Sequence, residues 1–119
     1  MPMIEVPRLN YIEIAMTLQD IGYPDRPKVN LADARVIFTV KEHLADSEDL
    51  IRIRKDNTGG GLVIVDPTEG KILITLTSGD LVLPPSDYWY DIFIIRDNRV
   101  HSCEPRTFRV KPTVLGVLP

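Results

Sequence analysis

Several short stretches of this chain carry residue types that could do chemistry. The first reads DNTGGGLVIV at 56–65, and its three successive glycines suggest a phosphate-binding loop. Such a loop needs a following Lys-Ser/Thr and a helix whose N-terminal amides face the phosphate. Here a run of Leu, Val and Ile follows instead, which predicts a strand. Because glycine tolerates positive φ, we expect a β-turn at a hairpin tip and no phosphate site.

His101 and Cys103 are two residues apart, so on a strand they would share a face. A Cys–His nucleophilic pair also needs an orienting third group and a cleft, and the sequence indicates neither. We therefore expect a buried thiol beside a polar strand residue, and we assign no catalytic residue.

Carboxylates cluster in ADSEDL at 45–50, and Asp66 and Glu69 flank Pro67. Paired carboxylates can serve acid–base or Ca²⁺ chemistry. The first cluster lacks the alternate-residue ligands and the glycine of an EF-hand loop. We interpret both as solvated loops, with a weak Ca²⁺ site in the loop as the alternative, and we assign no metal ligand and no cofactor.

The segments that must position these groups follow a period of two. Apolar side chains at every second position predict strands, and Ile, Val and Thr suit a pleated surface. Turn residues separate the segments at spacings of about ten residues, and no segment of helical period interrupts them. Seven such segments can be recognised: 11–18, 34–41, 51–54, 62–65, 71–77, 88–96 and 108–110. We therefore predict an all-β, two-sheet antiparallel β-sandwich over residues 10–111.

The length, charge and cysteine content of the chain exclude several classes of function. A chain of 119 residues with net charge −3 forms one domain, and its basic residues are scattered, which argues against a nucleic-acid partner. The single cysteine excludes an internal disulfide. No apolar run approaches the ~20 residues that span a bilayer, and the start of the chain does not resemble a signal peptide. We expect a cytosolic protein without a membrane partner.

Residues 88–96 predict a strand with two apolar faces. Tyr88 follows LPPSD, where a tyrosine corner occurs in immunoglobulin-like sandwiches, so we assign structural roles to Tyr88 and to the inward-facing Tyr90. The other face carries Trp89, Phe93 and Ile95, which together would form an apolar patch of several hundred Å². Either the connection at 19–33 covers this face within the chain, or a partner covers it.

Both ends of the chain are apolar and interrupted by proline. The head reads MPMIEVPRL, and after Lys111 the tail reads PTVLGVLP without a charge. Free tails are usually polar, whereas such segments suit extended docking along another subunit. We therefore predict an N-terminal arm at 1–9 and a C-terminal arm at 112–119. The predicted partner contacts are Trp89, Phe93, Ile95, Met3, Ile4, Val114, Leu115, Val117 and Leu118.

Three stretches resemble a known family. They are VNLADARVIFTVK (29–41), GLVIVDPTEGKILITLTSGDL (61–81) and LPPSDYWYDIFIIRDNRVHSCEPRTFRVKP (83–112). Their order resembles the small immunoglobulin-like proteins of tailed bacteriophages, and is similar to the N-terminal domain of baseplate upper proteins and to related tail or head accessory proteins. The resemblance implies an immunoglobulin-like sandwich of about seven strands.

The same resemblance implies a non-enzymatic virion component that is made in the bacterial cytoplasm. It would be an adaptor or spacer in the tail, baseplate or fibre-attachment region, in contact with other virion proteins and with copies of itself. Two alternatives stay open, a capsid decoration (cement) protein and a carbohydrate-binding module in which Trp89 and nearby tyrosines stack on sugar rings.

Overall fold

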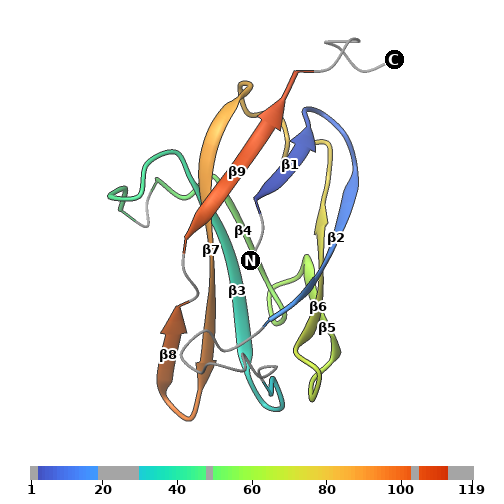
Figure 1. Cartoon of the computed structure of the whole chain (residues 1–119), viewed down its shortest axis with the longest axis vertical. Helices are drawn as coiled ribbons and strands as arrows, with labels where there is room; N and C mark the ends of the chain where they lie inside the picture. Colours follow the sequence, from blue (N-terminus) through green and yellow to red (C-terminus); the bar gives the residue numbers. More distant parts are fainter. Residues whose placement is uncertain (1–2, 19–29, 48–49, 103–104, 113–119) are drawn as a thin grey trace.

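A computed structural model describes residues 3–18, 30–47, 50–102 and 105–112. None of these residues forms a helix that could cross a bilayer. The chain path is drawn in Figure 1. The strands are β1 (Ile4–Pro7), β2 (Ile12–Thr17), β3 (Arg35–Lys41), β4 (Ile53–Asp56), β5 (Leu62–Asp66), β6 (Lys71–Leu76), β7 (Ser86–Arg96), β8 (Arg99–Ser102) and β9 (Arg106–Lys111).

The strands form two sheets, which confirms the predicted all-β sandwich. The larger sheet has the order β1-β9-β7-β3-β4, with β8 also paired to β7, and the smaller sheet has the order β2-β6-β5. Every pairing is antiparallel except the one between β1 and β9. The long β7 lies at the centre of the larger sheet (Figure 1). Two strands, β1 and β8, were not expected from the sequence.

The core lies between the two sheets and is built from the apolar side chains that the strands turn toward each other. Three aromatic rings from neighbouring strands are in contact at its centre. The ring centroid of Phe38 lies 5.8 Å from that of Tyr90 and 6.2 Å from that of Phe108. Ile72 and Ile74 of β6 are fully buried in the same cluster. Burial of one face of each strand is the main term that stabilises the fold.

Tyr88 makes the hydrogen bond that defines a tyrosine corner. Its hydroxyl donates to the carbonyl oxygen of Pro84 at 2.8 Å, and the residue is almost fully buried. This bond holds the segment 84–88 at the point where the chain passes from the smaller sheet into β7. Tyr90, Ile92 and Ile94 continue inward along the same face of β7.

The structure corrects the predicted N-terminal arm. Residues 4–7 form the edge strand β1, in which Ile4 lies opposite Phe108 and Val6 opposite Val110. Ile4 and Val6 are buried, so Ile4 is not a surface for a partner, whereas Met3 is 45% exposed. The apolar residues of this segment complete the core of their own domain. The predicted contacts Val114, Leu115, Val117 and Leu118 lie outside the described residues.

Candidate functional site

The outer face of the larger sheet carries the aromatic residues that the core does not use. Alternation along β7 sends Trp89, Asp91 and Phe93 to this face. The register with β3 places Lys41 opposite Trp89 and Thr39 opposite Asp91. The indole of Trp89 remains 37% exposed, whereas Thr39 is buried. The outer face is therefore closely packed at Thr39 and open to solvent at Trp89.

A cavity of about 170 Å³ opens on this face. Trp89 and Phe93 of β7 provide aromatic walls. Leu44, in the loop after β3, and Pro105, immediately before β9, add aliphatic walls. An apolar cavity of about 150 Å³ is large enough to hold benzene. The cavity therefore matches one six-membered ring or one branched aliphatic side chain. We call it the Trp89 cavity.

Two charged residues line the Trp89 cavity, and contacts within the protein orient both. The Lys41 ammonium donates to the backbone oxygen of Asp46 at 2.9 Å, so its head is held toward the loop and its aliphatic stem faces the cavity. The Asp91 carboxylate accepts the backbone N–H of Ile92 at 2.7 Å. The lining thus combines aromatic and aliphatic walls with a comparable share of polar surface, and its polar groups could orient a guest by its backbone.

The predicted contact residues of β7 separate into two places. Trp89 and Phe93 meet at the cavity, whereas Ile95 lies farther along the strand, opposite Val100 of β8. Sequence reasoning missed Leu44 and Pro105. Neither lies in an alternating pattern, and only the path of the loops brings them to β7. The backbone oxygen of Asn30 accepts a hydrogen bond from Arg96 at 3.1 Å. Residues 19–29 of the expected covering segment lie outside the described residues.

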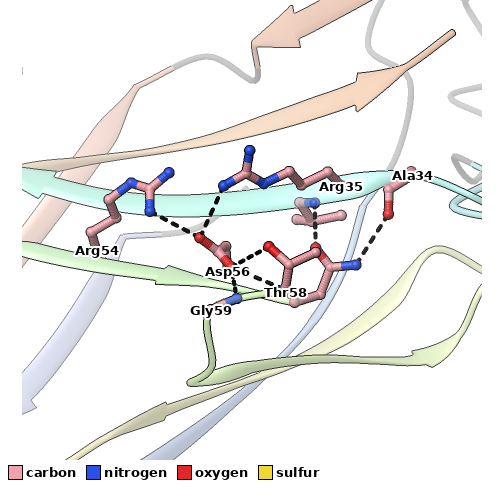
Figure 2. A network of polar contacts seen from close by, with 8 residues as sticks. Ala34, Arg35, Arg54, Asp56, Thr58 and Gly59 are labelled. Carbon is pink, nitrogen blue, oxygen red and sulfur yellow. Dashed lines mark hydrogen bonds and ion pairs between the residues drawn. The ribbon is translucent and has the colours of Figure 1, made fainter. Parts of the chain in front are cut away.

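A second polar cluster lies where β4 ends (Figure 2). The Asp56 carboxylate is 2% exposed and accepts from the Arg54 guanidinium at 2.9 Å and from Arg35 at 3.5 Å. Its other oxygen accepts from the backbone N–H and the hydroxyl of Thr58, both at 2.9 Å, and from the backbone N–H of Gly59. The bonds from Gly59 and Thr58, aided by the Arg35 charge, lower the pKa of Asp56 to about 2.

The Asp56 cluster is a structural device that holds a turn. Asn57 next to it accepts the N–H of Val36 at 2.8 Å and donates to the oxygen of Ala34 at 3.1 Å, which ties the turn to β3. The backbone N–H of Gly60 donates to the backbone oxygen of Asp56 at 2.9 Å, and Gly60 has φ of 112°. The predicted glycine turn is confirmed. The carboxylate serves the turn and is nearly sealed from solvent, so it does not present itself to a substrate.

The chain is similar in sequence to a known enzyme. No protein-family model matches the chain. It is 26% identical over 91 residues to an acireductone dioxygenase from Heterostelium pallidum, which covers 71% of this chain and 61% of the relative. The chain thus spans less than two thirds of the length of that relative. A similarity of this size does not place the chain in the relative's family.

This match corrects the expected function. A role as a structural component of a bacteriophage virion is wrong on this finding, because the similar protein is an enzyme. The expectation that the chain is not an enzyme is weakened for the same reason. The partners and the virion location inferred from the phage resemblance stay untested expectations.

The histidines of this chain do not fit the metal site of a non-haem oxygenase. Such sites hold iron with two histidines and one carboxylate. The chain has two histidines, His43 and His101. Lys41 pairs with Trp89 of β7, and His101 pairs with Ile94 of the same strand. Lys41 and His101 are therefore five residues apart along the direction of β7, a distance of about 16 Å. His43 lies two residues beyond Lys41, in the direction away from Ile94.

Ligands of one metal ion each lie about 2 Å from it, so the two histidines cannot share an ion. Among the described residues, no group of three or more His, Cys, Asp or Glu side chains could hold a metal ion. We therefore derive no oxygen chemistry for this chain.

A metal-loading experiment tests this conclusion. After incubation with Fe²⁺, Ni²⁺ or Zn²⁺ and desalting, we expect far less than one ion per chain by mass spectrometry of the metals. The double variant His43→Ala/His101→Ala should behave like the unmodified chain. One tightly held ion per chain, lost in that variant, would contradict the geometry.

Proposed function

We propose that this chain is a binding domain that takes one aromatic or branched aliphatic side chain of a protein partner in the Trp89 cavity. One observation carries the proposal: Trp89 lies 37% exposed beside a ring-sized cavity on the outer face of the larger sheet. Tryptophans that lie in pockets of this kind dominate the energy of many protein interfaces.

The size of the cavity favours a side chain over a metabolite. Pockets for drug-sized ligands and cofactors have volumes of about 300–1,000 Å³, well above that of the Trp89 cavity. A single side chain fits, and flanking contacts on the sheet face would supply the remaining affinity. Arg35 and Arg54 lie on β3 and β4 of the same sheet and are about half exposed, and arginine is enriched in such interfaces. The proposal thus needs a partner that presents an apolar anchor.

Fluorescence tests the proposal directly, because Trp89 is the only tryptophan of the chain. We expect a saturable change of the indole emission on titration with N-acetyl-phenylalanine amide, with a Kd of about 1–10 mM for so small a ligand. N-acetyl-alanine amide, which lacks the ring, is the matched probe and should give no saturation.

Two variants test whether the fluorescence response comes from binding in the Trp89 cavity. Leu44→Asp puts a charge on an exposed wall of the cavity and should weaken binding of the phenylalanine probe at least fivefold. Val100→Asp, at an exposed valine of β8 that does not line the cavity, should leave it unchanged. A response of the same size to both probes, or one unaffected by Leu44→Asp, would refute the proposal.

A further inference from the structure

The Trp89 cavity opens at one end of a longer apolar surface on the outer face of the larger sheet. The register of β7 with β3 places Ile37 beside Phe93, and its register with β8 places Val100 beside Ile95. These four side chains lie outside the core cluster between the sheets. Val100 is 63% exposed, and Phe93 and Ile95 are partly buried. We call this surface the outer band (Ile37, Phe93, Ile95 and Val100).

Two guanidinium groups flank the outer band on the side of β4. Arg54 and Arg35 contact the same oxygen of Asp56, at 2.9 Å and 3.5 Å, and Asp56 pairs with Ile37 in the sheet. The two groups therefore meet beside Ile37, although they come from different strands (Figure 2). We call them the guanidinium pair. The pair shares one buried carboxylate, and its side chains are 45% and 48% exposed, so an excess positive charge faces solvent beside the band.

The cavity, the guanidinium pair and the end of the outer band lie at even intervals along β7. The cavity spans Trp89 to Phe93, so its middle is level with Asp91. The guanidinium pair is level with Phe93 through the pairing of β3 with β7, and the end of the band is level with Ile95, beside Val100. Successive levels are two residues apart, about 6.6 Å, which is also the spacing of alternate side chains in an extended chain.

We propose that the partner is an extended segment with three side chains facing this sheet at alternate positions. The first is the apolar anchor in the Trp89 cavity, the second is acidic and reaches the guanidinium pair, and the third is apolar and covers Ile95 and Val100. This inference rests on the proposed function and names the chemistry of its partner.

Charge complementarity is the reason to infer an acidic residue at the middle level. Lys41 and Asp91 line the cavity with opposite charges, so the excess positive charge lies at the guanidinium pair. A guanidinium has five N–H donors and can therefore hold Asp56 and a guest carboxylate together. The same excess charge disfavours a basic residue at this level.

The peptide acetyl-Phe-Ser-Glu-Ser-Phe-amide tests the inference, because its side chains read the same in both directions and it contains no tryptophan. From the emission of Trp89 we expect a Kd at least tenfold below that of N-acetyl-phenylalanine amide, since further contacts add to the same anchor. The peptide with glutamine in place of glutamate should bind at least threefold more weakly at low salt. This difference should shrink at about 0.5 M salt, which screens exposed charges.

Three variants locate the contacts of the peptide. Val100→Asp places a carboxylate at the end of the outer band and should weaken the glutamate peptide at least fivefold while leaving the binding of the amide unchanged. Val63→Asp adds the same charge at a similarly exposed valine of the smaller sheet, so it is the matched control and should bind the peptide like the unmodified chain. Arg35→Gln should reduce the preference for glutamate over glutamine. Circular dichroism checks that each variant stays folded.

The outcomes separate this inference from the proposed function. A glutamate peptide that binds no more tightly than the amide would overturn the inference, as would equal affinities of the glutamate and glutamine peptides or equal binding by Val100→Asp and Val63→Asp. In each of these cases a saturable response to the amide leaves the Trp89 cavity as a binding site. No saturation with either the amide or the peptide would refute both proposals.

Discussion

Replacing Asp56 with asparagine should lower the free energy of unfolding by about 2 kcal/mol at neutral pH. The carboxylate is buried and its pKa lies at about 2, below the ordinary value of 3.8. Asparagine offers Thr58 and Gly59 a neutral oxygen, which accepts more weakly than a carboxylate. It also loses the ion pairs with Arg35 and Arg54. Because both guanidinium groups are about half exposed, they can return to water, which limits the loss.

The pH dependence of stability identifies the ionised form as the stabilising one. The folded chain binds a proton at Asp56 less readily than the unfolded chain, so this contribution is complete above pH of about 4 and disappears as the pH falls toward 2. Urea unfolding at a series of pH values measures it. The difference between the unmodified chain and Asp56→Asn should shrink across this window.

Asp66→Asn is the control, because Asp66 also caps a turn, through the hydroxyl of Thr68 at 3.1 Å. Its effect should stay within about 1 kcal/mol, as for a surface hydrogen bond. A pH-independent difference for Asp56→Asn would show that the network stabilises the fold through shape and not through charge.

Tyr88→Phe should destabilise the fold by about 1–2 kcal/mol, since it leaves the Pro84 oxygen without the hydroxyl that it accepts from at 2.8 Å. The ring of Tyr88 is buried and remains in the variant, so the packing around it is kept. Chemical denaturation with an unchanged m-value measures the loss of this one hydrogen bond.

Tyr11→Phe offers a matched control on the smaller sheet. Tyr11 is 63% exposed, and its hydroxyl donates to Glu13 at 3.0 Å in solvent. Water can replace that bond, so we expect a change within about 0.5 kcal/mol. Equal effects of the two substitutions would mean that Tyr88 does not hold the corner.

Much of the fold could be predicted from local patterns. The alternation of apolar residues at 34–41, 71–77 and 88–96 indicated three strands that the structure contains, because a pleated backbone sends successive side chains to opposite faces. The glycines after Asp56 indicated a turn, because positive φ suits glycine. The position of Tyr88 after its proline-rich turn indicated a hydroxyl bond to upstream backbone. Each of these inferences depends on neighbours within a few residues.

Less of the candidate site could be predicted. The sequence indicated that Trp89 and Phe93 share an outer face, but Leu44 and Pro105 reach the cavity only through the paths of their loops. Asp56 and Arg35 are 21 residues apart, and their contact follows from the pairing of β3 with β4. The match to an enzyme also overturned the functional expectation drawn from sequence resemblance.

The sequence by itself determined most of the strands, which face of each is apolar and where the chain turns. Only the tertiary structure decided which strands are neighbours. It placed Ile4 beside Phe108 in a parallel pair, where the apolar head had suggested a docking arm, and it left β5 at the edge of its sheet. The physical reason is range: alternation is a property of the local backbone, whereas pairing depends on contacts between residues far apart in the chain, whose closure entropy no local pattern encodes.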